Sequence, residues 1–135
     1  MSERIIFDTS VLVDELRSGC YRQRIASIAG VIRISAVVLA ELSRGVVSIA
    51  ERGFLESLAK SRPILTPTEK NWLESGQLLA EMRSDLHFPA AKLRDLHFDV
   101  LIALTARSHG ARLITSNRKD FEMIRRYRKF ELEVW

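Results

Sequence analysis

The residues of this chain that could do chemistry are four carboxylates far apart in the sequence. Each lies beside a short apolar segment, where a charged side chain is poorly placed for a solvated surface. They are Asp8, Glu41, Asp99 and Asp120. Burying a carboxylate costs several kcal/mol unless a cation or hydrogen bonds compensate, so these acids need partners.

Acids that meet at one place repel one another unless a cation lies between them. The sole cysteine, Cys20, excludes a cysteine-clustered zinc site, and the three histidines (His87, His97 and His109) lack metal-ligand spacing. A donor set made only of oxygen favours a hard divalent ion, Mg²⁺ or Mn²⁺. The sequence also offers no glycine-rich phosphate loop and no serine or cysteine nucleophile motif.

Each acid also has a purely structural interpretation. Asp8 could cap the helix expected from Val11, and Glu41 could pair with Arg44 on the same helix face. Asp99 is harder to explain in this way, because its segment is apolar almost all round. A favourable helix dipole contributes only about 0.3–1 kcal/mol, which is too little to offset deep burial.

The elements that must position these acids alternate between strand-like and helix-like patterns, which predicts a three-layer α/β sandwich with a mostly parallel central sheet. Expected strands cover residues 5–7, 31–35, 63–66, 112–115 and 130–135. Expected helices start near residues 11 and 68 and cover 21–29, 36–44, 48–60, 98–108 and about 120–126, and residues 85–94 are expected to form a loop. Sites in parallel sheets form beyond the carboxyl ends of the strands, so Asp8 and Asp120 should share one edge.

The composition is that of one domain over residues 1–135, with 47% hydrophobic and 28% charged residues. The longest apolar runs are five residues, whereas a membrane span needs about 18. Only three apolar residues separate Arg4 from Asp8, which excludes a signal-peptide core at this end. We therefore expect a cytoplasmic protein without a membrane partner.

The formal net charge of +4 is unevenly distributed: residues 107–129 hold eight basic residues and two acidic ones. Such an excess is typical of a surface that meets a polyanion, although a solvated helix face explains it equally well.

Four short segments resemble, in order, the motifs of PIN-domain nucleases. They are Ile5–Leu12, Ser35–Leu42 with Gly45, Asp99–Ala106 and Leu113–Phe121. The ordered set covers almost the whole chain, and the size is similar to that of the VapC-type toxins of bacterial and archaeal toxin–antitoxin pairs.

The resemblance implies a PIN-like fold and an endoribonuclease that hydrolyses RNA with Mg²⁺ or Mn²⁺. Asp8, Glu41 and Asp99 match the metal-holding acids of the family. The fourth family acid often occupies the position of Asn117, so Asp120 is expected to complete the site directly or through water. The resemblance also implies a homodimer and a small antitoxin that blocks the active site.

Supporting roles follow from the same comparison. Ser10 matches a small polar residue that supports the first acid, and Thr115 and Ser116 are expected to orient metal-bound water. The basic segment would hold the RNA backbone through Arg112, Arg118, Lys119, Arg125 and Arg126. Phe88, His97 or Tyr127 could stack an unpaired base or simply pack in the protein.

Two other classes of function remain open at this point. A catalytically silent PIN-like module that binds RNA or protein would explain the uncharged residue at Asn117. A phosphoacceptor domain is disfavoured, because the third expected strand ends in Thr66 and Pro67 instead of an aspartate. Surplus apolar residues could form a dimer contact or an antitoxin groove, or pack on the sheet: Leu39, Val46, Val47, Ile49, Phe54 and Leu55.

Overall fold

The computed structural model describes residues 2–135, so Met1 of the expected domain lies outside the described part. Its centre is a five-stranded sheet in the order β3-β2-β1-β4-β5, and every neighbouring pair is parallel. The strands are β1 (Arg4–Phe7), β2 (Val31–Ser35), β3 (Ile64–Leu65), β4 (Arg112–Thr115) and β5 (Glu131–Val134). The expected parallel sheet is confirmed.

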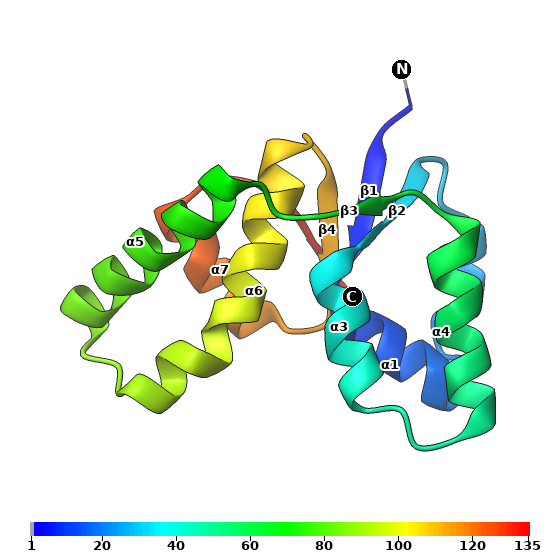
Figure 1. Ribbon diagram of the computed structural model, residues 1–135. Coiled ribbons are helices and arrows are strands. Elements are labelled where there is room, and N and C mark those ends of the chain that lie inside the picture. The colour runs from blue at the N-terminus through cyan, green and yellow to red at the C-terminus, as the bar shows by residue number, and fades with distance from the viewer. Residues whose placement is uncertain (1) are drawn as a thin grey trace.

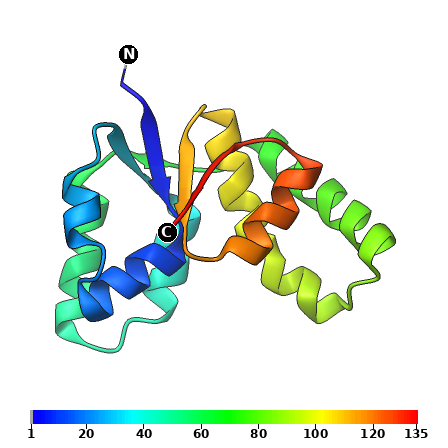
Figure 2. The ribbon, with the colours of Figure 1, turned by 180° about the vertical axis from the view of Figure 1, so that it is seen from behind.

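Helices cover both faces of this sheet. They are α1 (Thr9–Ser18), α2 (Arg22–Ala26), α3 (Ala36–Arg44), α4 (Ile49–Ser61), α5 (Glu69–Leu86), α6 (Ala90–Ser108) and α7 (Arg118–Tyr127). Figures 1 and 2 show α5, α6 and α7 on one side of the sheet and α1, α3 and α4 on the other. The three-layer arrangement predicted from the alternating pattern is therefore present.

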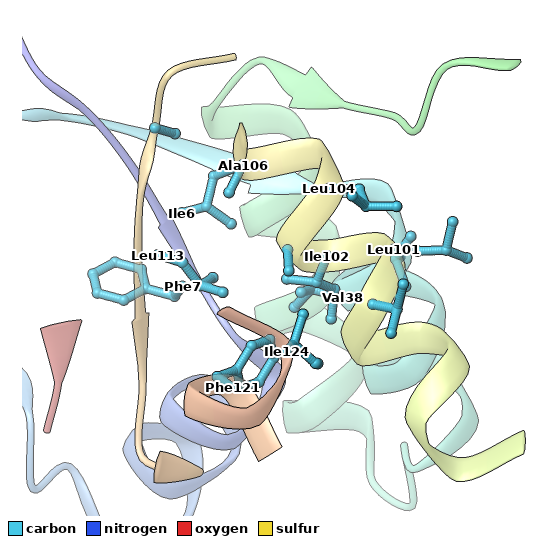
Figure 3. Packing of buried hydrophobic residues seen from close by; sticks show 14 of the residues in the cluster. Ile6, Phe7, Val38, Leu101, Ile102, Leu104, Ala106, Leu113, Phe121 and Ile124 are labelled. Atoms are coloured by element: carbon cyan, nitrogen blue, oxygen red, sulfur yellow. The ribbon is translucent and has the colours of Figure 1, made fainter. Parts of the chain in front are cut away.

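The core forms where α6 and α7 pack against the central strands. Ile5 and Ile6 of β1 are fully buried because this strand has a neighbour on each side and helices on each face. Figure 3 shows apolar side chains of α6 and α7 in one cluster with those of the strands. Residues 100–106 are buried throughout, since α6 lies between the sheet and α5. Within residues 2–135, no helix is long and apolar enough to cross a membrane.

The main departure from the expected elements is the length of α6. Residues 85–94 were expected to form a loop, but α5 continues to Leu86 and α6 already starts at Ala90. His87 adopts a left-handed conformation (φ 55°) that ends α5, and Pro89 immediately precedes the first residue of α6. Proline is tolerated at a helix start because its missing N–H needs no partner there, so Pro89 starts a helix instead of marking a loop.

Candidate active site

The carboxyl edge of the sheet positions Asp8 and Glu41 through the helices that start there. Asp8 is the residue between β1 and α1, and its backbone N–H donates to the carbonyl of Ile114 in β4 at 2.9 Å. Glu41 lies in α3, which follows β2 without a break. The Ser35 hydroxyl caps that helix by accepting from the N–H groups of Val37 and Val38 at 3.1 and 3.3 Å.

Asp99 reaches the same edge from the middle of α6. This helix ends at Ser108, just before β4 starts, so it runs from the carboxyl edge of the sheet toward the amino edge. Nine residues at 1.5 Å each place Asp99 about 13 Å from the end of the helix, which is close to the length of a four-residue strand. Asp99 is therefore level with the carboxyl ends of β1 and β4.

Two hydroxyls hold the carboxylate of Asp8, which is only 3% exposed. Ser10 Oγ donates to Asp8 Oδ2 at 2.7 Å, and Thr115 Oγ1 donates to the same oxygen at 2.8 Å. These hydroxyls accept in turn from the backbone N–H groups of Ser116 and Asn117, at 3.1 and 2.9 Å. The turn after β4 thus fixes the orientation of a carboxylate that is more than a hundred residues away in the sequence.

Glu41 is held by Thr9, a contact that sequence reasoning missed. Thr9 Oγ1 donates to Glu41 Oε1 at 2.8 Å, while Arg44 Nη2 lies 3.7 Å from Glu41 Oε2. Burial raises the pKa of Glu41 above its ordinary value, the negative charge of Asp8 raises it further, and the Thr9 bond opposes both. The ion pair with Arg44 that the structural interpretation predicted is present, but Glu41 also faces Asp8.

The carboxyl group of Asp99 has a strongly raised pKa. Burial is the largest cause of a rise in the pKa of Asp99 from 3.8 to about 8, and the charges of Asp8, Glu41 and Asp120 contribute to the same rise. Lys92 opposes it. Because three other acids act on one carboxyl group, the four predicted acids lie near one another at the carboxyl edge of the sheet, and this group of four side chains is called the acidic pocket below.

Asp120 occupies the side of this pocket formed by α7. Its Oδ1 lies 3.2 Å from Lys92 Nζ, and its Oδ2 accepts from Asn117 Nδ2 at 3.1 Å. Asn117 Oδ1 accepts in turn from the Asp120 N–H at 3.4 Å and so caps α7. Asn117 therefore holds the carboxylate of Asp120 and caps the start of α7.

The chemistry of this pocket suits a divalent cation, although its carboxylates are not yet arranged as a ligand set. Among residues 2–135, no group of three or more His, Cys, Asp or Glu side chains is arranged to hold a metal ion. The donors are nevertheless all oxygen, and a positive charge among them would offset the burial and the repulsion that raise the pKa of Asp99. Asp8, Glu41 and Asp99 are the residues that would hold such an ion.

A family model for the PIN domain matches residues 5–127 of the chain. The chain belongs to the PIN-domain family. No curated protein matches its sequence at a significant level.

Several solved structures are similar to this chain in fold. The DNA-bound VapBC of Salmonella typhimurium has a TM-score of 0.76 at 22% identity, and VapBC2 of Rickettsia felis, bound to a promoter DNA fragment, has 0.74 at 26%. In both comparisons 98% of each chain is covered. VapC20 of Mycobacterium tuberculosis, a sarcin-ricin loop cleaving toxin, has a TM-score of 0.60 at 20% identity over 82% of this chain and 86% of its own.

Around the PIN-domain pocket, the basic residues predicted to contact RNA divide into two groups. Arg118, Lys119, Arg125 and Arg126 are exposed on α7, which starts at the acidic edge. Arg112 instead starts β4 at the opposite edge, where it pairs with Glu3 and Glu133 at 2.9 Å each. Its charge is neutralised by these two glutamates, and Arg112 lies away from the surface near the acids.

The other supporting and stacking candidates also separate. The Ser116 hydroxyl lies toward Asp14 at 3.4 Å, so only its backbone N–H serves the pocket. His97 contacts Ser75 at 3.0 Å on the α5 side, and Tyr127 donates to Asp85 at 3.0 Å. Phe88 is the stacking candidate beside the pocket, with its ring centroid 5.9 Å from Lys92 Nζ.

Lys92 is the second residue that sequence reasoning missed. It lies seven residues before Asp99, two helical turns along the same face of α6. That spacing was a usable signal, but it has meaning only if residues 90–98 are helical. The spacing was not recognised as helical, because Pro89 suggested that residues 85–94 form a loop.

Proposed function

We propose that this PIN-domain protein is a divalent-cation-dependent endoribonuclease, the toxin of a toxin–antitoxin pair. The observation that carries the proposal is the rise of the Asp99 pKa to about 8 under the influence of Asp8, Glu41 and Asp120. Acids gathered in this way are costly to the fold, and they are typical of sites that bind a cation and a phosphate.

The chain's own residues would divide the work of hydrolysis. A bound Mg²⁺ or Mn²⁺ lowers the pKa of water and offsets charge on the scissile phosphate. Asp8 and Asp99 would hold the ion, and Glu41 would either hold it or accept a proton from the attacking water. Ser10 and Thr115 keep Asp8 in place, since both donate to its Oδ2.

The RNA backbone would lie along the exposed cations of α7, which continue from the acidic edge. Arg118, Lys119, Arg125 and Arg126 supply the charge, although Arg118 shares its own with Glu122 at 3.0 Å. Phe88 is suitably placed to stack on an unpaired base next to the pocket. A cytoplasmic location fits this substrate.

An antitoxin and a second copy of the chain are the expected protein partners. The similar structures from Salmonella typhimurium and Rickettsia felis are VapBC assemblies, which supports an antitoxin partner here. Val47, in the turn from α3 to α4, and Ile49, the first residue of α4, are 87% and 90% exposed and could form part of such an interface. Of the other candidates, Phe54 and Leu55 are half-buried and line the α4 packing instead.

Replacing Asp99→Asn tests the proposal, with Asp95→Asn, an exposed carboxylate one turn earlier in the same helix, as the matched control. We expect Asp99→Asn to reduce Mn²⁺-dependent RNA cleavage by at least about 100-fold, because a cation ligand is lost. Asp95→Asn should cleave like the wild type. Cleavage by Asp99→Asn at the wild-type rate, with contaminating nuclease excluded, would show that the site is assigned wrongly.

The catalytically silent binding module is the second candidate. It is favoured by the uncharged Asn117 and by the spread of carboxylates in the described residues, which do not form a ligand set. A wild-type protein that binds RNA but leaves it intact in both Mg²⁺ and Mn²⁺ would support this alternative.

A further inference from the structure

The fourth corner of the acidic pocket carries an ion pair, not a free carboxylate. Both oxygens of Asp120 have partners: Lys92 Nζ lies 3.2 Å from Oδ1, and Asn117 Nδ2 donates to Oδ2 at 3.1 Å. In contrast, the two hydroxyl bonds to Asp8 both go to its Oδ2. Oδ1 of Asp8 accepts neither of these bonds, whereas each oxygen of Asp120 already has one partner and has only its second lone pair left for a metal ion.

Lys92 is built into this corner from two directions. Its ammonium group lies between the carboxylate of Asp120 and the ring of Phe88, whose centroid is 5.9 Å away. Its side chain is 33% exposed, so the charge is held in place while still open to solvent. A partly desolvated lysine presents a compact positive charge, which is well suited to bind a phosphate oxygen.

The position of Lys92 along α6 places it just beyond Asp99. Seven residues at 1.5 Å each separate the two by about 10 Å along the helix axis, on the same face. Residues 90–98 extend past the carboxyl edge of the sheet, because Asp99 is already level with that edge. A polyanion that enters the pocket at Asp99 therefore passes the Lys92 ammonium group.

We propose that Lys92 binds a phosphate of the RNA at the pocket and that Asp120 positions Lys92 instead of ligating the metal ion. The proposal rests on the proposed ribonuclease function and deepens it. Asp8, Glu41 and Asp99 hold the divalent ion, and Lys92 supplies the positive charge on the α7 side. Asn117 thus holds the carboxylate of Asp120 by a hydrogen bond, and Asp120 in turn holds the ammonium group of Lys92 by an ion pair.

The first test measures RNA binding without cleavage. All proteins carry Asp99→Asn, and a fluorescein-labelled single-stranded RNA of mixed sequence is titrated at several KCl concentrations. We expect Lys92→Met to weaken binding and to reduce the slope of log K against log salt by about 0.7, the value for one lost phosphate contact. Lys92→Arg should restore the slope.

Lys70→Met is the matched control, because Lys70 lies in the first turn of α5 just as Lys92 lies in that of α6. The neighbouring Asn71 donates to Ser108 at 2.9 Å, which places Lys70 near the opposite edge of the sheet. Lys70→Met should leave affinity and slope unchanged. Equal slopes for Lys92→Met and Lys70→Met would overturn the role of Lys92.

The second test separates a positioning residue from a metal ligand. The double variant Lys92→Met/Asp120→Asn removes the ion pair without changing the net charge, and Mn²⁺ binding is measured by calorimetry. We expect its Mn²⁺ affinity to stay within about threefold of wild type, whereas a lost ligand would cost about tenfold or more. A tenfold loss would show that Asp120 is a ligand and overturn that part of the proposal.

These readouts do not depend on catalysis. A protein that binds Mn²⁺ and RNA as expected but never cleaves would contradict the proposed ribonuclease function alone. Unchanged RNA binding in Lys92→Met, together with normal cleavage by the wild type, would contradict the role of Lys92 alone.

Discussion

At the scale of single residues, Asp99 shows how a pocket can weaken the fold that contains it. Its carboxyl group is buried and faces Asp8, Glu41 and Asp120, and its pKa rises to about 8. In the unfolded chain the same group ionises near pH 3.9. Between these two values the folded protein keeps a proton that the unfolded chain has released.

This difference predicts how stability depends on pH without divalent ions. Because the folded state binds more protons on Asp99, the free energy of unfolding contributed by this group falls as pH rises from about 4 to about 8. Asp99→Asn removes this loss in the free energy of unfolding, because asparagine does not ionise. We therefore expect Asp99→Asn to melt about 5 °C or more above wild type at pH 8 in EDTA.

At pH 4, close to the pKa of Asp99 in the unfolded chain, the two melting temperatures should nearly coincide. Asp95→Asn, at an exposed position one turn earlier in the same helix, should track the wild type at both values. A constant difference between Asp99→Asn and wild type from pH 4 to pH 8 would contradict the raised pKa.

At the scale of elements, the strands and α3 were predictable because their signals are local. Val31–Ser35 and Ala36–Arg44 follow from an apolar run, a serine cap and a terminal glycine, and the structure has the same bounds. The first half of α6 was not predictable in this way. Its residues lack a clear apolar period, and packing against α5 gives them a helical conformation that local sequence does not indicate.

The acids of the pocket were predictable for a different reason. A carboxylate beside an apolar run conflicts with its surroundings, and that conflict is visible in the sequence at Asp8, Glu41 and Asp99. Their hydrogen-bond partners show no such conflict. Thr9 and Lys92 are ordinary residues for their positions, and only the fold reveals what they contact.

Helix capping gives a prediction at this scale. Ser35→Ala removes the cap of α3, which carries Glu41, and Ser48→Ala removes the cap of α4, where Ser48 Oγ accepts from the Glu51 N–H at 3.1 Å. Each should lower the free energy of unfolding by about 1 kcal/mol in urea titrations. Only Ser35→Ala should also weaken Mn²⁺ binding, because α3 positions the pocket residue Glu41 and α4 positions none of the four acids.

Ser48→Ala serves as the matched control for this effect. Similar losses of Mn²⁺ affinity in both variants would mean that the change comes from general destabilisation and not from the orientation of α3.

At the scale of the whole molecule, packing decides which cations face solvent. Arg107 donates to the carbonyl of Lys129 at 2.9 Å, Arg112 pairs with two glutamates, and Arg128 lies 3.6 Å from Glu74 and 3.2 Å from Glu81. Part of the basic excess of residues 107–129 is thereby taken up by intramolecular hydrogen bonds and ion pairs. What remains exposed is concentrated on α7.

This distribution predicts the salt dependence of RNA binding. Arg125→Gln/Arg126→Gln should reduce the slope of log K against log salt by about 1.4, corresponding to two phosphate contacts. Arg52→Gln/Arg62→Gln removes the same charge from exposed positions on and after α4, on the opposite side of the sheet, and should leave the slope unchanged. Equal reductions in both double variants would place the RNA elsewhere.

The bond from Thr115 to Asp8 has a consequence for the synthesis of the protein. Asp8 is translated 107 residues before Thr115 of β4, whose hydroxyl orients it. A nascent polypeptide that still lacks β4 cannot assemble the pocket. Under the proposed function, a chain still on the ribosome therefore has no assembled site for RNA cleavage until β4 has been translated.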